Sequence, residues 1–150
     1  MDREAGFTLI EAVCALAIVG LLATLVLPAI PRATSQSRLA GYAVDVAALL
    51  KGDRNAAMRD HVAVATSLDA ERRTVRSGAT AAVVEIPADV TFAALLAQRC
   101  AGRPVASTID FFPSGASCGG AIAISRQGVA YQIRVNWLTG GVEVVAIDKS

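Results

Sequence analysis

The chain has 150 residues, of which 54% are hydrophobic and 18% are charged, and its formal net charge is +1. Residues 32–150 carry thirteen Lys or Arg and ten Asp or Glu, so this ordinary, soluble-type portion has only a small positive excess. That balance gives no electrostatic reason to expect nucleic acid as a partner. These 119 residues suffice for one modest core and are too few for two comfortable domains.

The N-terminal part of the chain is apolar over the length of a membrane span. Residues 12–30 are nineteen residues without a charge, and Glu11 directly precedes them. About 20 mainly apolar residues, at a rise of 1.5 Å each, cover a hydrocarbon core of roughly 30 Å. We therefore expect a single transmembrane helix over residues 7–31. Because a carboxylate in hydrocarbon is costly, Glu11 requires a partner of opposite charge.

A cleaved secretory signal peptide is the alternative, because it too begins with a short polar region followed by an apolar one. Here the apolar run is longer than such a region, and Arg3 is the only basic side chain before it. Residues 28–32 also lack a clear small-x-small cleavage pattern. These features favour a retained membrane anchor. The leader has no net side-chain charge, so the count of Lys and Arg does not set the orientation of this anchor.

The run Gly6-Phe7-Thr8-Leu9-Ile10-Glu11 resembles the processing and assembly motif of type IV pilins and type II secretion pseudopilins. The resemblance implies that residues 1–6 are a leader, that a prepilin peptidase cuts between Gly6 and Phe7, and that Phe7 is then N-methylated. The new ammonium group would lie one helical turn from Glu11, so in a filament it can pair with the Glu11 carboxylate of a neighbouring subunit. Glu11 would thus direct filament assembly, the alternative being an acid tolerated near the membrane interface. Pro28 falls where many such proteins bend this helix.

A second helical pattern follows the anchor. Its spacing of three and four residues predicts that the helix continues over residues 32–61 and docks one apolar stripe on a folded domain. Arg54 and Arg59, near its end, are interpreted as charges on the solvated face. The stripe consists of Leu39, Tyr42, Val46, Leu49 and Leu50.

Residues 62–150 are predicted to form a β-rich domain. Alternating and β-branched runs predict a hairpin, then short strands, then a run of three strands near the C-terminus. Residues 90–98 are ambiguous, because Phe92, Leu95 and Leu96 fit a helical turn as well as an irregular strand. One long helix followed by antiparallel strands makes an α+β chain. The predicted strands are 62–68, 74–76, 82–86, 109–112, 121–125, 130–137 and 141–147.

Several stretches of this domain resemble the GspH/FimT group of minor pseudopilins. The resemblance implies a type IV pilin-like fold, with a long N-terminal transmembrane helix packed on a C-terminal antiparallel β-sheet domain. The calcium-site pattern of the major pseudopilin is not evident, which favours a minor subunit. The stretches that carry the resemblance are 53–58, 62–68, 109–115, 119–120, 131–135 and 138–142.

The family resemblance also implies a function and a location. The chain would be a structural subunit of the type II secretion pseudopilus, which helps to export folded proteins across the outer membrane. It would cross the bacterial inner membrane once and place its C-terminal domain in the periplasm. Its partners would be other pseudopilins in a filament, the prepilin peptidase, the inner-membrane secretion platform and the lipid bilayer.

Two alternatives to the secretion pseudopilin stay open. One is a FimT-like minor pilin of a type IV pilus, acting in pilus assembly or DNA uptake. Arg72, Arg73 and Arg76 form the basic cluster that could contact DNA, although we interpret them as turn residues of a solvated hairpin. The other is a membrane-tethered binding domain outside any filament, for which the motif of residues 6–11 would be a coincidence.

The three cysteines and the single histidine give no sign of catalysis or metal binding. Cys14 lies in the predicted anchor and is interpreted as a small apolar packing residue. Cys100 and Cys118 can form a disulfide in the oxidising periplasm, with two unpaired thiols as the alternative. No CxxC motif and no ligand-spaced histidine accompany them, so we expect no metal and no cofactor. His61 has no recognisable nucleophile and orienting acid around it, so we expect no catalytic residue and no enzyme.

Overall fold

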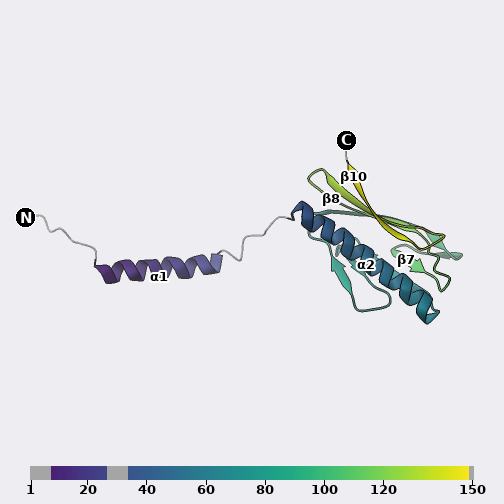
Figure 1. Ribbon diagram of the computed structural model, residues 1–150, viewed down its shortest axis with the longest axis horizontal. Coiled ribbons are helices and arrows are strands. Elements are labelled where there is room, and N and C mark those ends of the chain that lie inside the picture. Colours follow the sequence, from purple (N-terminus) through teal and green to yellow (C-terminus); the bar gives the residue numbers. More distant parts are fainter. Residues whose placement is uncertain (1–7, 27–33, 149–150) are drawn as a thin grey trace, which may run out of the picture. The chain divides into compact units, whose positions relative to one another are not determined.

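The computed structural model describes residues 8–26 and 34–148 of the chain (Figure 1). The chain divides into two units, Met1–Ala33 and Thr34–Ser150. In the first unit, helix α1 spans Leu9–Val26. None of the helices in the described residues has the combination of length and apolar character needed to cross a membrane. Residues 7 and 27–31 of the predicted anchor lie outside the described residues, as does Pro28, the predicted helix bend.

Helix α2, Gln36–Asp60, begins and ends with local capping groups. The hydroxyl oxygen of Ser35 accepts a hydrogen bond from the N–H of Arg38 at 3.3 Å, which satisfies one free donor of the first turn. At the other end His61 adopts a left-handed conformation with φ 55°, the backbone geometry that commonly ends a helix. The helix continues through Gly52, but it is shorter than the predicted segment 32–61, because it begins at Gln36, after the Ser35 cap, and ends at Asp60.

The predicted apolar stripe of α2 is confirmed. Leu39, Val46 and Leu50 are buried, and Tyr42 and Leu49 pack against the core at its margin. In Figure 1, α2 is the long helix that lies against the strands of the second unit. It contacts β1, β3 and β7 on one sheet and β8, β9 and β10 on the other. One helix therefore supplies a shared core wall for both sheets.

The strands form two four-stranded antiparallel sheets and one small hairpin. The first sheet has the order β3-β2-β1-β7, and the second has the order β10-β9-β8-β4. Strands β5 and β6 pair only with each other. The first sheet contains β1 (Val64–Asp69), β2 (Thr74–Arg76), β3 (Val83–Glu85) and β7 (Thr108–Phe111). The second contains β4 (Thr91–Leu96), β8 (Gly120–Arg126), β9 (Val129–Val135) and β10 (Val142–Asp148), and the hairpin contains β5 (Arg99–Cys100) and β6 (Arg103–Pro104).

The α+β class is confirmed, with a helix packed on an antiparallel β-sheet domain. The predicted hairpin is β1–β2, in which Ser67 faces Arg76, and the predicted C-terminal run is the meander β8–β9–β10. Within the ambiguous residues 90–98, Thr91–Leu96 form strand β4, which pairs along its length with β8. The two-residue strands β5 and β6 were not predicted, because two residues carry no periodicity.

Candidate functional site

Glu11, the residue predicted to direct assembly, lies in the first turn of α1. Its backbone N–H donates to the carbonyl oxygen of Thr8 at 3.0 Å. Its side chain is exposed and forms no ion pair within the described residues. A negative charge is favourable at this end of a helix, because the free N–H groups there carry partial positive charge. Gly6 and Phe7, the predicted processing and methylation residues, lie outside the described residues.

Helix α1 also presents a continuous apolar surface. Leu9 is 84% exposed, and Ile10, Leu16 and Leu21 are exposed to a similar degree. Within its own unit, α1 therefore leaves apolar side chains uncovered along residues 9–22. The one carboxylate and the apolar surface therefore occur together on the same short helix.

Asp53 is a buried carboxylate that sequence reasoning did not single out. It is 1% exposed and lies on the core side of α2. The Thr66 hydroxyl donates to Asp53 Oδ2 at 2.5 Å, and the Ser77 hydroxyl donates to Oδ1. The N–H groups of Gly78 and Ala79 also donate to this carboxylate, at 2.9 and 3.3 Å. Asp53 therefore ties α2 to strand β1 and to the loop between β2 and β3.

Arg54, predicted to be a solvated-face charge, instead joins α2 to two loops. Its Nε donates to the carbonyl oxygen of Gly115 at 3.1 Å and to that of Thr139 at 3.0 Å. Gly115 and Gly140 both have positive φ, 86° and 62°, and a Cβ at Gly140 would overlap the Gly115 carbonyl. The close approach of these loops therefore depends on glycine and on one arginine donor. Arg59 fits its interpretation, because it is exposed and pairs with its neighbour Asp60 at 2.9 Å.

A second polar cluster fixes the start of the C-terminal unit. The backbone N–H and the hydroxyl of Thr34 both donate to Asp89, at 2.8 and 2.9 Å. Arg126 donates to the carbonyl of Thr34 and forms an ion pair with Asp89, with 3.0 Å between Nε and Oδ2. The first described residue of this unit is thus held to the turn before β4 and to the end of β8.

This cluster predicts a dependence of stability on acid. The hydrogen bonds from Thr34, followed in importance by the Arg126 charge, lower the pKa of the Asp89 carboxyl. Because the folded pKa lies below the unfolded value of about 3.9, the stabilisation is present above that value and is lost as pH falls through the folded pKa. We expect Asp89→Asn to lower the thermal midpoint at pH 7. Between pH 7 and pH 2.5, the thermal midpoint of this variant should fall by less than that of the unaltered chain. Asp45→Asn, which replaces an exposed carboxylate on α2, serves as the control. If the thermal midpoints of Asp89→Asn and of the unaltered chain fell in parallel with pH, Asp89 would not be the source of the acid dependence.

In the basic cluster considered for DNA contact, Arg72 and Arg76 line one surface pocket, whereas the Arg73 side chain binds carbonyl groups of its own domain. Arg72 pairs with Asp69 at 3.6 Å on the turn between β1 and β2. Arg73 is half-buried and donates to the carbonyls of Ile86, Pro87 and Val90. Arg76 is exposed on β2. The interpretation as a solvated turn residue holds for Arg72, whereas Arg73 lies in the same turn but is half-buried and anchors the chain that leads into β4.

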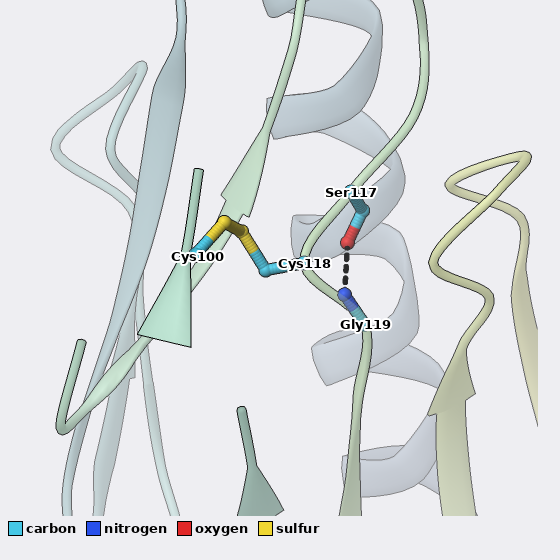
Figure 2. Close-up of a disulfide and its surroundings, with 4 residues drawn as sticks. All are labelled: Cys100, Ser117, Cys118 and Gly119. Atoms are coloured by element: carbon cyan, nitrogen blue, oxygen red, sulfur yellow. Dashed lines mark hydrogen bonds between the residues drawn. A yellow bond between two sulfur atoms is a disulfide. The ribbon is translucent and has the colours of Figure 1, made fainter. Parts of the chain in front are cut away.

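Cys100 and Cys118 are joined by a disulfide, with 5.6 Å between their Cα atoms (Figure 2). It attaches the β5–β6 hairpin to the loop that precedes β8. Next to Cys118, the Ser117 hydroxyl accepts a hydrogen bond from the N–H of Gly119 at 2.8 Å. The Asp110 carboxylate lies within 4.8 Å of both sulfur atoms, which are bonded to each other and so are not thiolate ligands. Cys14 is unpaired and exposed on α1.

Comparisons with known proteins agree with both parts of the chain. Residues 1–27 match the model of the prokaryotic N-terminal methylation motif. The fold is similar to a crystal structure of the type IV minor pilin FimU of Pseudomonas aeruginosa, with a TM-score of 0.54 and 15% identity. That match covers 75% of this chain and 91% of that one. The fold of this chain is type IV pilin-like.

A second crystal form of FimU gives the same result for the pilin-like chain. Its TM-score is 0.50 at 13% identity, over 70% of this chain and 90% of that one. No curated protein sequence matches the chain. At such low identity the likeness shows the fold, and the methylation motif independently connects residues 1–27 with prepilin-like proteins.

Proposed function

We propose that this pilin-like chain is a minor pseudopilin, a structural and not a catalytic subunit of the type II secretion pseudopilus, which helps to export folded proteins. The observation that carries the proposal is the methylation motif over residues 1–27 on a chain whose remaining domain has the fold of a minor pilin. In this role a prepilin peptidase cuts after Gly6, and Phe7 becomes the methylated terminus. The apolar N-terminal segment anchors the subunit in the inner membrane beside the secretion platform until it joins other pseudopilins.

The proposed periplasmic location of the domain is supported by its cysteine chemistry. The disulfide between Cys100 and Cys118 is of a kind that persists in oxidising compartments. The apolar exposure of α1 fits a segment covered by lipid before assembly and by neighbouring helices afterwards. In the filament, Glu11 pairs with the amino terminus of a neighbouring subunit and so sets the register between them.

The second candidate is a FimT-like minor pilin of a type IV pilus. The likeness to FimU, which is a type IV minor pilin, favours it. A DNA-uptake role through residues 72–76 receives less support, because Arg72 and Arg73 already bind groups of their own domain.

Deletion of the gene in its own host separates these functions. The secreted proteome, surface piliation and DNA uptake are measured in the deletion strain and after the gene is restored. Loss of exported proteins with intact pili supports the secretion pseudopilin. Loss of piliation or DNA uptake with normal secretion would replace it with the minor pilin.

Glu11→Ala tests the assembly mechanism itself. Removal of the carboxylate leaves the amino terminus of a neighbouring subunit without its partner at the membrane edge, so we expect incorporation into filaments to fall on the order of tenfold. Cleavage after Gly6 should persist, because the scissile bond is unchanged. Immunoblotting of sheared filaments measures incorporation, and mass spectrometry of the membrane-bound chain measures cleavage.

Two further variants test whether the charge of Glu11 is what matters and provide a matched control. Glu11→Gln keeps the size of the side chain but not its charge, and it should fail as Glu11→Ala does if charge pairing sets the register. Cys14→Ser changes another exposed α1 residue and should assemble normally. Incorporation of Glu11→Ala at the level of the unaltered chain would remove Glu11 from the mechanism.

A further inference from the structure

Three of the four outer strands in the two sheets are protected against pairing with another chain. Strand β3 has only three residues and includes Glu85, and β10 carries Glu143. Strand β7 is covered by the loop before β8, through a bridge between Phe111 and Ser117 and a hydrogen bond from Cys118 N–H to the Asp110 carbonyl at 3.0 Å. Short length, charge and coverage are the usual ways in which proteins block exposed sheet edges.

Strand β4 is the exception among these edges in the described part of the chain. It pairs with β8 on one side and is the last strand of the second sheet on the other. Its six residues are Thr-Phe-Ala-Ala-Leu-Leu, and Ala97 and Gln98 follow without a charge. Leu95 is 78% exposed, although its neighbour in sequence Leu96 packs against the core. An uncharged outer strand of this length is a ready template for strand addition.

The free side of β4 opens into an apolar groove. The larger part has a volume of about 800 Å³ and is lined by residues 94–98 and 104–106, none of which is charged. It adjoins a smaller part of about 230 Å³, lined by β4 residues together with Leu68, Ala70, Ala106 and Ser107. One end is closed by a hydrogen bond from Val105 N–H to the Gln98 carbonyl at 3.0 Å. The groove thus runs along β4 beside a second stretch of chain.

The closed end of this groove carries positive charge. The β5–β6 hairpin follows Gln98 and includes Pro104, and both of these residues line the groove. The hairpin presents the exposed side chains of Arg99 and Arg103. Neither arginine forms an ion pair with another described residue. The disulfide at Cys100 holds the hairpin in place. An occupant that is apolar along β4 and acidic at this end therefore complements the groove in both respects.

We propose that β4 binds an extended segment of a second, different pilin-like subunit, which adds to the second sheet as an outer strand. Main-chain hydrogen bonds to β4 supply affinity, and alternate apolar side chains of the added segment enter the groove. An acidic side chain of the same segment faces Arg99 and Arg103. This inference rests on the proposed function, because a filament subunit has other pilin-like subunits as neighbours.

Amide hydrogen exchange on the full chain in detergent tests the proposal. The chain is mixed in turn with each other protein of its host that carries the N-terminal methylation motif. With one of them, exchange in residues 91–96 is expected to slow at least tenfold, because backbone N–H groups that face solvent become hydrogen-bonded. Leu95→Lys, which places a charge on the outer strand, should abolish this slowing. Val62→Lys, at another exposed apolar position outside the groove, should retain it.

Thermal unfolding of each variant alone shows whether the variant is folded. If Leu95→Lys is unfolded, Ala93→Lys replaces it. Unchanged exchange in residues 91–96 with every subunit would overturn the proposal, as would equal slowing in Leu95→Lys. Slowing in the chain alone that increases with its concentration would also overturn it, in favour of pairing between two copies. Normal incorporation into filaments with an unprotected β4 would overturn strand addition and leave the proposed function intact.

Discussion

Asp53→Ala is expected to destabilise the folded domain by about 2 to 6 kcal/mol, because it leaves the two buried hydroxyl groups of Thr66 and Ser77 without their acceptor. The carboxylate accepts four hydrogen bonds, from two hydroxyls and two backbone N–H groups, and alanine accepts none. A buried donor left without an acceptor costs about 1 to 3 kcal/mol. The cost falls below the sum of four such losses, because Gly78 and Ala79 are exposed and water can reach their N–H groups.

Urea unfolding measures this fall in the free energy of unfolding, and two further variants serve for comparison. Asp45→Ala removes an exposed carboxylate from the same helix and should change stability by about 0.5 kcal/mol or less. Asp53→Asn keeps one acceptor oxygen but directs an NH₂ group toward neighbouring donors, so its cost should be intermediate. If Asp53→Ala unfolded at the same urea concentration as Asp45→Ala, Asp53 would have no special structural role.

The position of Asp53 could have been inferred from the sequence, whereas its partners could not. Asp53 follows Val46 and Leu50 at helical spacing, so it falls on the apolar stripe that docks on the domain. An acid on such a stripe is expected to be buried with donors. The donors themselves come from residues 66 and 77–79, and only the folded arrangement of β1 and the next loop brings them to the helix.

For Arg54 and Arg73, too, the sequence did not predict the hydrogen-bond partners. In the sequence each is a basic residue near a helix end or a turn, where solvent exposure is the ordinary expectation. In the structure Arg54 donates to the carbonyl oxygens of Gly115 and Thr139, 61 and 85 residues away, and Arg73 donates to the carbonyl oxygen of Pro87, 14 residues away. Carbonyls at loop ends leave no mark in a sequence, because every residue has one.

Local patterns predicted the strands well wherever a regular alternation was long enough. The meander β8–β9–β10 follows from alternating residues and from the turn at Gln127 and Gly128, whose φ values of 49° and 83° suit a two-residue hairpin loop. Strand β4 remained ambiguous because both faces of this outer strand contain small or apolar residues. The same lack of alternation that hid β4 in the sequence makes it an open strand in the fold.

The double change Cys100→Ser with Cys118→Ser is expected to destabilise the domain by about 3 kcal/mol in the chain-entropy model, which corresponds to a fall in the thermal midpoint on the order of 10 °C. The disulfide closes a loop with a sequence separation of 18, and its Cα atoms lie 5.6 Å apart, within the usual range. Calorimetry of the unaltered chain with and without a dithiol reductant measures the same loss. Cys14→Ser removes the free cysteine and should leave the midpoint unchanged.

Removal of the disulfide should lower the local stability of the β5–β6 hairpin as well as the stability of the whole domain, because the disulfide is the main attachment of this short hairpin. Without it, residues 99–104 keep the β5–β6 pairing, the Val105 to Gln98 hydrogen bond and an internal hydrogen bond from Arg99 to the Gly102 carbonyl. Amide exchange there should accelerate, whereas the β8–β9 ladder, which has its own hydrogen bonds and packs on α2, should stay protected. Equal midpoints with and without reductant, together with unchanged exchange at residues 99–104, would show that the hairpin holds its position by packing alone. In that case the groove along β4 would keep its basic end even in a reducing compartment.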